Sequence, residues 1–134
     1  MFELVGIDHI VLRTTQLNAM LDFYCGALGC NVERETPPEI GLTQMRAGNA
    51  LIDLVVADSR LGKLGGGPPT QTENNVDHFC LQLKSISERE IKTHLESHGI
   101  EVGDFDERYG AQGLGQSIYI KDPEGNVVEL RSQV

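Results

Sequence analysis

Two histidines and two carboxylates stand at matching places in the two halves of this sequence. An Asp-His pair occurs as Asp8-His9 and again as Asp77-His78, each within a short run of β-favouring residues. A carboxylate lies in the last β-rich run of each half, as Asp53 and as Glu129. Two imidazoles with one or two carboxylates suit a first-row divalent ion, and an incomplete shell leaves room for substrate. We therefore predict one metal ion bound by both histidines and Glu129, with Asp53 as a fourth ligand.

Each of these residues also has a simpler interpretation. A single strand histidine is more often a satisfied core or edge residue than a ligand. Asp53 could form an ion pair with Arg13 or Arg46, and Glu129 could face solvent near the end of the chain. The metal hypothesis is stronger for the set than for any member, because the polar positions match in type and in order.

The repeat also predicts the strands that position these residues. Ile7–Leu12 and Val76–Leu81 are expected as first strands, and Ala50–Leu54 and Asn126–Leu130 as last strands. Side chains alternate along a strand, so each ionisable residue shares its face with largely apolar neighbours. We expect these residues to point into a semi-enclosed interior, where an unpaired carboxylate would be costly and a cation would stabilise it.

A helical stretch follows each first strand. The first is expected to begin with Asn18 as its N-cap and to end near Gly29. The second has capping-box spacing between Ser87 and Glu90, and Gly99 supplies the glycine expected just after its end. Each half therefore reads as a strand, a helix and further strands, which predicts an α+β fold.

The rest of the chain connects these elements. Residues 58–75, centred on Gly65–Pro69, form a linker by composition, and the order of a phosphate-binding loop is absent. Ser117–Lys121 and Asn126–Arg131 flank a turn and should pair as an antiparallel hairpin. Glycines in the preceding segment, residues 108–116, allow either a loop that closes over substrate or an ordinary flexible connection.

Composition narrows the partners. The net charge of −9 disfavours nucleic acid and anionic membranes, which both require a basic face, and leaves a small molecule or another protein. The three cysteines contain no C-x-x-C pair, which favours a reducing compartment, and the sequence is interpreted as cytoplasmic. One of them, Cys80, shares the face of His78 and is expected as a small hydrophobic residue or a neighbour of the metal. His94 and His98 have helical i,i+4 spacing but no third ligand near them.

These motifs resemble the vicinal-oxygen-chelate superfamily, which includes glyoxalase I, extradiol dioxygenases and bleomycin-resistance proteins, and they are closest to small glyoxalase I-like domain proteins. The resemblance extends from Ile7 to Arg131 and depends on the two Asp-His pairs, Asp22-Phe23-Tyr24, and Ser117-Ile118-Tyr119 with the Asp122–Asn126 turn and Glu129. It implies a single domain over residues 1–134, with module one at 5–57 and module two at 76–132. Each module would be a βαβββ unit of a curled mixed sheet around the metal, commonly within a homodimer.

The resemblance also implies roles for individual residues. His9, His78 and Glu129 match metal-binding positions, and Asp53 falls where relatives have glutamate or glutamine. One divalent ion per site is expected, from among Ni, Co, Mn, Fe and Zn. Glu129, Asp53 and Tyr119 are the expected catalytic residues, and Arg13, Ser117 and Tyr119 are the expected substrate-binding residues.

The function implied is that of a metal-dependent lyase or isomerase that chelates a small substrate through neighbouring oxygens. Two alternatives stay open: an Fe(II) extradiol-type dioxygenase, and a non-enzymatic protein that binds a small ligand such as an antibiotic. Ile118-Tyr119, Asp122-Pro123, Gly125 and Glu129 match most of the dioxygenase signature. Its upstream histidine is missing, and Gln112 stands nearest.

Overall fold

The chain forms two compact units, each built on one four-stranded mixed sheet. The computed structural model describes residues 1–133, which divide into Met1–Asn75 (unit 1) and a second unit that begins at Val76 (unit 2). Sheet and helix occur in both units, so the α+β class predicted from the sequence is confirmed. The assignment of residues 1–134 to one domain stays a prediction.

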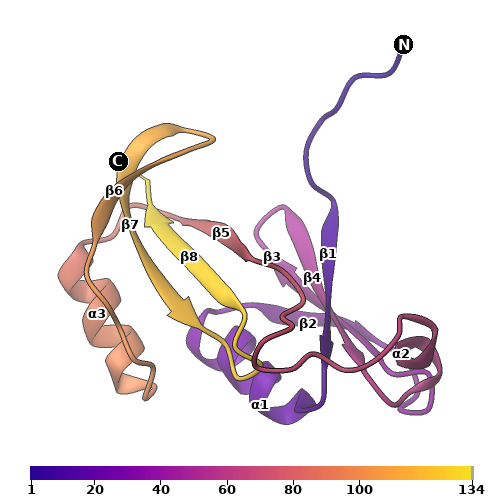
Figure 1. Cartoon of the computed structure of the whole chain (residues 1–134). Helices are drawn as coiled ribbons and strands as arrows, with labels where there is room; N and C mark the ends of the chain where they lie inside the picture. Colours follow the sequence, from indigo (N-terminus) through magenta and orange to yellow (C-terminus); the bar gives the residue numbers. More distant parts are fainter. Residues whose placement is uncertain (134) are drawn as a thin grey trace. The chain divides into compact units, whose positions relative to one another are not determined.

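Unit 1 has its first strand beside its last strand. Its elements are β1 (His9–Thr14), α1 (Leu17–Leu21), a π-helical continuation η1 (Asp22–Ala27), β2 (Asn31–Glu35), β3 (Leu42–Ala47), β4 (Ala50–Val56) and α2 (Arg60–Leu64). The sheet order is β1-β4-β3-β2 (Figure 1). β1 runs parallel to β4, and the other pairs are antiparallel.

Unit 2 repeats this topology strand for strand. Its elements are β5 (His78–Leu83), α3 (Glu88–Ser97), β6 (Asp106–Gly110), β7 (Gly113–Lys121) and β8 (Val127–Ser132). The sheet order is β5-β8-β7-β6, with β5 parallel to β8 (Figure 1). β7 and β8 form the antiparallel hairpin predicted from the sequence. The prediction of two βαβββ modules is therefore confirmed.

α1 and η1 in unit 1, and α3 in unit 2, cover one face of their sheet, and the two Asp-His histidines lie on the other face. In unit 1 the covered face carries Leu12, Met45, Ile52 and Leu54, all buried, and the helix contributes buried side chains such as Tyr24. The core of unit 2 follows the same plan, with Ile91 and Leu95 of α3 and strand residues Ile118, Ile120, Val128 and Leu130. Alternation along the strands then places His9 and His78 on the faces opposite these cores.

Both first strands begin two residues later than the sequence predicts. In unit 2, His78 pairs with Val127, the first residue of β8, so the residues before it have no partner in the ladder. In unit 1, the ladder begins with His9 opposite Leu51, after a hydrogen bond from Leu51 N to the carbonyl of Asp8. The histidines therefore stand at the first position of each strand.

The helix ends agree with the sequence in unit 2 and differ in unit 1. Ser87 and Glu90 form the reciprocal capping box, and Gly99 follows the helix at a φ of +72°. In unit 1 the prediction of Asn18 as N-cap is wrong, because the helix starts at Leu17 and Gln16 occupies the cap position. The Gln16 amide donates to Thr14 Oγ1 at 2.8 Å, which turns the chain before Asn18 is reached.

The linker contains a short helix, α2, which its composition did not predict. Ser59 accepts a hydrogen bond from Gly62 N and caps α2, so the segment predicted to be a linker, residues 58–75, is structured at its start.

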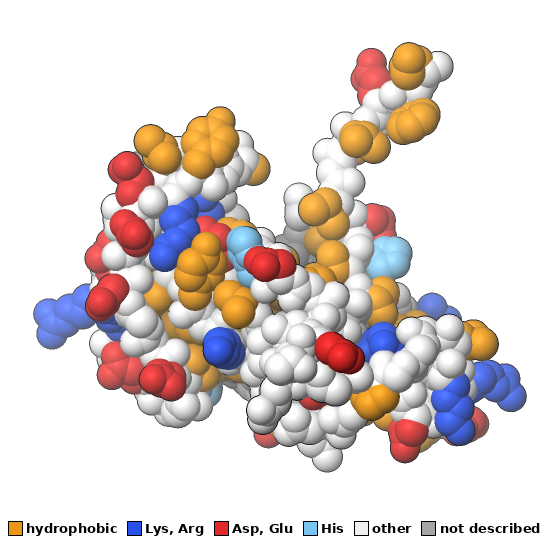
Figure 2. All heavy atoms as spheres, viewed as in Figure 1, with side chains coloured by type: hydrophobic (Ala, Val, Ile, Leu, Met, Phe, Trp, Pro, Cys, Tyr) orange, Lys and Arg blue, Asp and Glu red, His pale blue; other side chains and the backbone are white. Residues whose placement is uncertain are grey.

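At the other end of unit 1, residues 1–8 precede β1 without regular structure, and their apolar side chains Met1, Phe2, Leu4, Val5 and Ile7 are exposed (Figure 2). No helix within residues 1–133 has the length and apolar character needed to cross a membrane.

Candidate metal and substrate site

Each unit holds its first-strand histidine in one orientation through the aspartate before it. In unit 1 the distance from His9 Nδ1 to Asp8 Oδ1 is 2.6 Å, and in unit 2 His78 Nδ1 lies 2.6 Å from Asp77 Oδ1. The carboxylate accepts a hydrogen bond from Nδ1–H, which in a neutral ring leaves the lone pair on the other nitrogen, Nε2. This is the arrangement that orients metal-binding histidines. Asp8 and Asp77 were not predicted from the sequence to have this role, although the repeated Asp-His pair is a signal for it.

Unit 1 places a buried carboxylate on the same face as its histidine. Asp53 stands between Val11 and Gln44 in the ladder, two residues beyond the Leu51 that pairs with His9. Its side chain is only 2% exposed, and its Oδ2 accepts a hydrogen bond of 3.2 Å from Gln44 Nε2. Its Oδ1 is buried with no hydrogen-bond partner among residues 1–133. A buried carboxylate oxygen of this kind is costly unless a cation or proton stabilises it.

The ion pairs that were alternatives for Asp53 do not form within unit 1. Arg46 binds Glu33 instead, with distances of 3.0 and 2.9 Å from Nε and Nη2 to the two carboxylate oxygens. Arg13 donates from Nη2 to the carbonyl of Gly66 in the linker. The pKa of His9 is raised, chiefly by its hydrogen bond to Asp8 and further by the negative charge of Asp53. His9 and Asp53 therefore interact electrostatically within unit 1.

Arg13 is held by the linker as well as by its strand. Its main chain forms a two-way clamp with Asn75, whose Oδ1 accepts from Arg13 N and whose Nδ2 donates to Arg13 O. Its Nε is buried without a partner among residues 1–133. The structure thus gives this guanidinium one contact to the linker, and its role in binding substrate stays a prediction.

Unit 2 places Glu129 against His78. Their closest approach, from His78 Nε2 to Glu129 Oε1, is 3.6 Å, and Glu129 is 6% exposed. Glu129 stands between Cys80 and Tyr119 in the ladder, and the Tyr119 ring meets the His78 ring edge-on at a centroid distance of 5.5 Å. A histidine, a buried carboxylate and a phenol therefore share one face of the sheet of unit 2.

Two arginines join this face, and neither was predicted from the sequence as a site residue. The guanidinium of Arg108 lies 4.2 Å from the ring centroid of Tyr119 and donates from Nη1 to the carbonyl and hydroxyl oxygens of Ser117, at 2.7 and 3.0 Å. The guanidinium of Arg131 donates from Nη2 to the carbonyls of Gly113 and Arg108, at 2.8 and 3.3 Å. Arg108 is half-buried and Arg131 is buried.

The glycines of the β6–β7 hairpin make room for Arg131. A Cβ at Gly110 would overlap Arg131 Nη1, and one at Gly115 would lie 2.8 Å from Arg131 Nη2. Residues 108–116, predicted from the sequence to be a loop, belong mainly to β6 and β7, with only a tight turn between the strands. Gly110 and Gly115 therefore serve close packing by a side chain, a use that spacing alone did not indicate.

Two further groups, Cys80 and the pair of His94 and His98, were also considered as possible metal ligands from the sequence. Burial raises the pKa of the Cys80 thiol to about 11, with a further contribution from the charge of Glu129, so the thiol is protonated at neutral pH. His94 and His98 lie with ring centroids 4.7 Å apart on α3. Neither unit contains, within residues 1–133, a group of three or more His, Cys, Asp or Glu side chains able to hold a metal ion. Each unit thus supplies two of the four predicted ligands.

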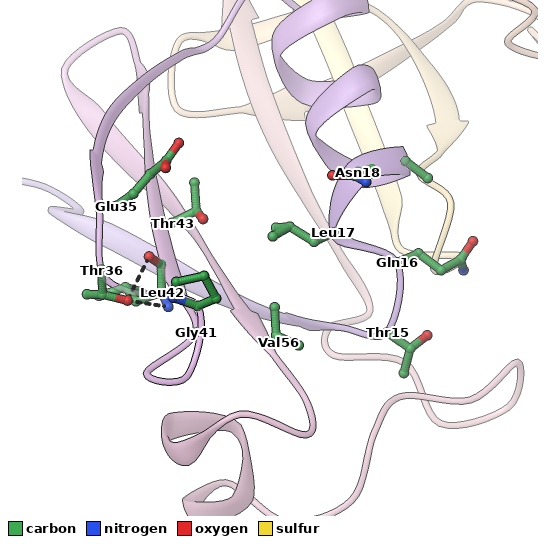
Figure 3. A pocket seen from close by; sticks show the side chains of 12 residues that line it. Thr15, Gln16, Leu17, Asn18, Glu35, Thr36, Gly41, Leu42, Thr43 and Val56 are labelled. Atoms are coloured by element: carbon green, nitrogen blue, oxygen red, sulfur yellow. Dashed lines mark hydrogen bonds between the residues drawn. The ribbon is translucent and has the colours of Figure 1, made fainter.

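Unit 1 also carries a pocket on the helix side of its sheet. It has a volume of about 650 Å³ and is lined by the segment Thr15–Ala19, by the β2–β3 connection and by Thr43 and Val56. Figure 3 shows Leu17 and Thr43 pointing toward one another across it. Thr43 and Val56 alternate with the residues that share the face of Asp53, so the pocket lies on the opposite face from His9 and Asp53.

A sequence profile decides the family. The profile of the Glyoxalase/Bleomycin resistance protein/Dioxygenase superfamily matches residues 6–130, nearly the whole chain. The chain belongs to this superfamily. The match includes both Asp-His pairs and both carboxylates, which confirms the resemblance inferred from the sequence.

Known members of the superfamily resemble the chain over most of its length. It is 32% identical to biphenyl-2,3-diol 1,2-dioxygenase 3 of Rhodococcus globerulus, over 93% of this chain and 62% of that protein. It is 26% identical to catechol-2,3-dioxygenase of Bacillus subtilis, over 94% of this chain and 40% of that protein. The chain therefore spans less than two thirds of the length of either dioxygenase.

A solved structure from this superfamily agrees with the fold over most of both chains. Lactoylglutathione lyase from Agrobacterium tumefaciens superposes with a TM-score of 0.66 at 25% identity, covering 96% of this chain and 93% of that one. The superfamily thus includes dioxygenases and lyases, and its members typically use a divalent metal.

Proposed function

We propose that this protein is a metal-dependent enzyme that chelates a small substrate through two neighbouring oxygens and moves a proton next to a carbonyl group, as a lyase or isomerase of glyoxalase type. The observation that carries the proposal is the repeated half-site. Each unit presents one histidine, oriented by an aspartate, and one buried carboxylate on the same face of its sheet. We infer that the two half-sites together bind one divalent ion.

The donor set fits such an ion. Asp53 has a buried oxygen that lacks a partner within residues 1–133, and each histidine has Nδ1 beside an aspartate, so that the neutral ring would present its Nε2 lone pair. Imidazole nitrogens with carboxylate oxygens suit the first-row divalent metals. His9, His78 and Glu129 would hold the ion, with Asp53 as the fourth ligand. The ion would supply Lewis-acid stabilisation of the charge that develops on the substrate oxygens.

The residues of the chain would do the rest of the chemistry. Glu129, which is buried and lies 3.6 Å from His78 Nε2, is the proposed general base. Because it is also a proposed ligand, it would have to release the ion in part to take up the proton. Asp53 is the second choice for this role. The phenol of Tyr119, whose ring touches that of His78, would donate a hydrogen bond to the substrate. The hydroxyl oxygen of Ser117 accepts a hydrogen bond from Arg108. We propose that Ser117 acts on the substrate through this contact, by holding Arg108 in place.

Replacement of Glu129 by glutamine tests the base. Glu129→Gln is expected to lower the rate of isomerisation of a methylglyoxal hemithioacetal by about 100- to 10,000-fold, because the amide cannot accept the proton. Both the glutathione adduct and an adduct of a simple thiol should be assayed, since the sequence does not fix the thiol. Glu107→Gln, at an exposed position on β6, is the matched control and should stay within about twofold of the parent. Undiminished activity in Glu129→Gln would remove it as the base.

The orienting aspartates give a second, independent prediction. Asp77→Asn is expected to weaken the binding of Zn²⁺ by about tenfold, because the amide holds the Nδ1 proton less strongly and makes Nε2 a poorer ligand. Asp8→Asn should have a similar effect. Isothermal titration of the purified variants with Zn²⁺ measures this, and Asp104→Asn serves as an exposed control in unit 2. An unchanged affinity in both variants would contradict the proposed role of the two pairs.

A ring-cleaving dioxygenase is the second candidate, and the two curated relatives favour it. Against it, the β6–β7 hairpin contains no histidine. The dioxygenase signature has a histidine upstream of Ile118-Tyr119, and the residue nearest that place here is Gln112, in the turn between β6 and β7. Oxygen uptake by Fe(II)-loaded protein with 2,3-dihydroxybiphenyl and catechol would separate the two reactions. Failure to bind any metal on titration would instead favour a protein that only sequesters a small ligand.

A further inference from the structure

The face of unit 2 that carries His78 and Glu129 also carries two arginines that form no ion pair with a carboxylate within residues 76–133. Ion pairs within residues 76–133 involve His78, with Asp77 and Glu129, and Lys92, with Asp104, and none includes Arg108 or Arg131. Arg131 is only 5% exposed, and a buried guanidinium without a counter-charge is costly. In a chain of net charge −9, this local excess of positive charge is unusual.

The two arginines differ in what they can still bind. The Arg131 side chain packs against Gly110 and Gly115 of the β6–β7 hairpin. Its Nη2 donates hydrogen bonds to two carbonyl oxygens. Arg108 uses only Nη1 for hydrogen bonds within residues 76–133, both of them to Ser117. Its Nε and Nη2 remain as donors on a half-buried guanidinium. An arginine fork of this kind recognises carboxylate, phosphate and phosphonate groups.

Arg108 also lies within reach of the reacting groups. Its guanidinium stacks on the ring of Tyr119, and that ring in turn contacts His78. The charged groups on the same face of the sheet are Glu129, Arg131, Lys121, His78 and, at the start of β6, Asp106. Glu129 is the one buried acid among them, and it is held beside His78.

We propose that Arg108 binds an oxyanion of the substrate, so that the natural substrates of this enzyme carry a carboxylate, phosphate or phosphonate in addition to the two chelating oxygens. The inference rests on the proposed function, since it assumes that the chelating oxygens sit at the metal. Arg131 holds the main chain of Arg108 in place through its bond to the Arg108 carbonyl. Arg108 is thus a specificity residue, and Arg131 is a positioning residue.

The test compares chelators that differ in whether they carry a carboxylate. Catechol, 2,3-dihydroxybenzoate and 3,4-dihydroxybenzoate share the same neighbouring oxygens, and the last two add a carboxylate. Isothermal titration of Zn²⁺-loaded protein should give the parent at least about tenfold tighter binding of one dihydroxybenzoate than of catechol. Arg108→Gln should abolish that preference by lowering the affinity for the dihydroxybenzoate to that for catechol, whereas Arg108→Lys should keep part of the preference. Arg89→Gln, on the exposed surface of α3, is the matched control.

Other outcomes separate the two proposals. A parent without preference for either carboxylate, or an Arg108→Gln variant that loses catechol and dihydroxybenzoate equally, would overturn the oxyanion role. If catechol itself fails to bind the Zn²⁺-loaded parent, the proposed chelation fails. The oxyanion site is then tested without metal, by ³¹P NMR titration with inorganic phosphate. Phosphate binding that Arg108→Gln weakens supports the site, and binding that is absent or unchanged in the variant contradicts it.

Discussion

His9→Gln and His78→Gln are each expected to weaken the binding of Zn²⁺ by at least about 100-fold, although the two histidines belong to different repeats. Loss of a direct ligand should cost more than loss of an orienting partner, for which about 10- to 100-fold is typical. Glutamine keeps a polar side chain at these exposed strand positions, so the fold should tolerate both changes. Titration with Zn²⁺, followed by elemental analysis of the dialysed protein, measures the affinity and the stoichiometry.

The same experiment contains its control. His94 and His98 form an i,i+4 pair on α3 with ring centroids 4.7 Å apart, and such a pair can bind metal weakly by itself. His94→Gln with His98→Gln should leave the tight site intact and remove only a weak second binding event. A parent that binds one equivalent per histidine-bearing unit, or a His9→Gln variant with full affinity, would contradict a single site shared by the repeats.

Gly62→Ala is expected to destabilise the protein by about 2–4 kcal/mol. A Cβ at Gly62 would overlap the carbonyl oxygen of Val56 and lie 2.5 Å from that of Ala57. Both obstacles are main-chain atoms at the end of β4, so relief would require α2 to move from the strand rather than a side chain to rotate. Urea unfolding followed by circular dichroism gives the change in the free energy of unfolding.

Gly26→Ala is the matched control for this change. Gly26 also lies in a helical segment, yet a Cβ there would meet no atom within 4 Å. Alanine at such a position is expected to be neutral or to stabilise by up to about 1 kcal/mol, since it restricts the unfolded chain. Similar stability for the two variants would show that α2 does not pack closely against the end of β4.

The sequence predicts the topology well because the same order of elements occurs twice along the chain. Each Asp-His strand, its helix and its closing strand could be aligned with a second copy, and both copies fold with the same sheet order. The capping box of Ser87 and Glu90 is also readable, since both partners lie within one turn. The prediction of Asn18 as N-cap is wrong because the Gln16 main-chain N–H donates to the hydroxyl of Thr14, a residue of the preceding strand, and this contact turns the chain before Asn18.

The site was predicted less completely, for a physical reason. Residue type and spacing identify groups able to bind metal, but they do not reveal where long side chains go. Arg108 reaches along the sheet to Ser117 and Tyr119, and Arg131 lies over glycines of the neighbouring hairpin. Neither contact follows from periodicity. The glycines at 110 and 115 looked like a sign of flexibility, whereas each leaves a space that a guanidinium fills.

The stretch ahead of β1 has a practical consequence for handling the protein. Its five exposed apolar side chains do not pack against the sheet, and such a segment is prone to proteolysis and self-association. A shortened chain that starts at Gly6 would lose most of them and retain Asp8, the contact from Leu51 to the Asp8 carbonyl and the whole of β1. Such a version should be the better starting material for crystallisation.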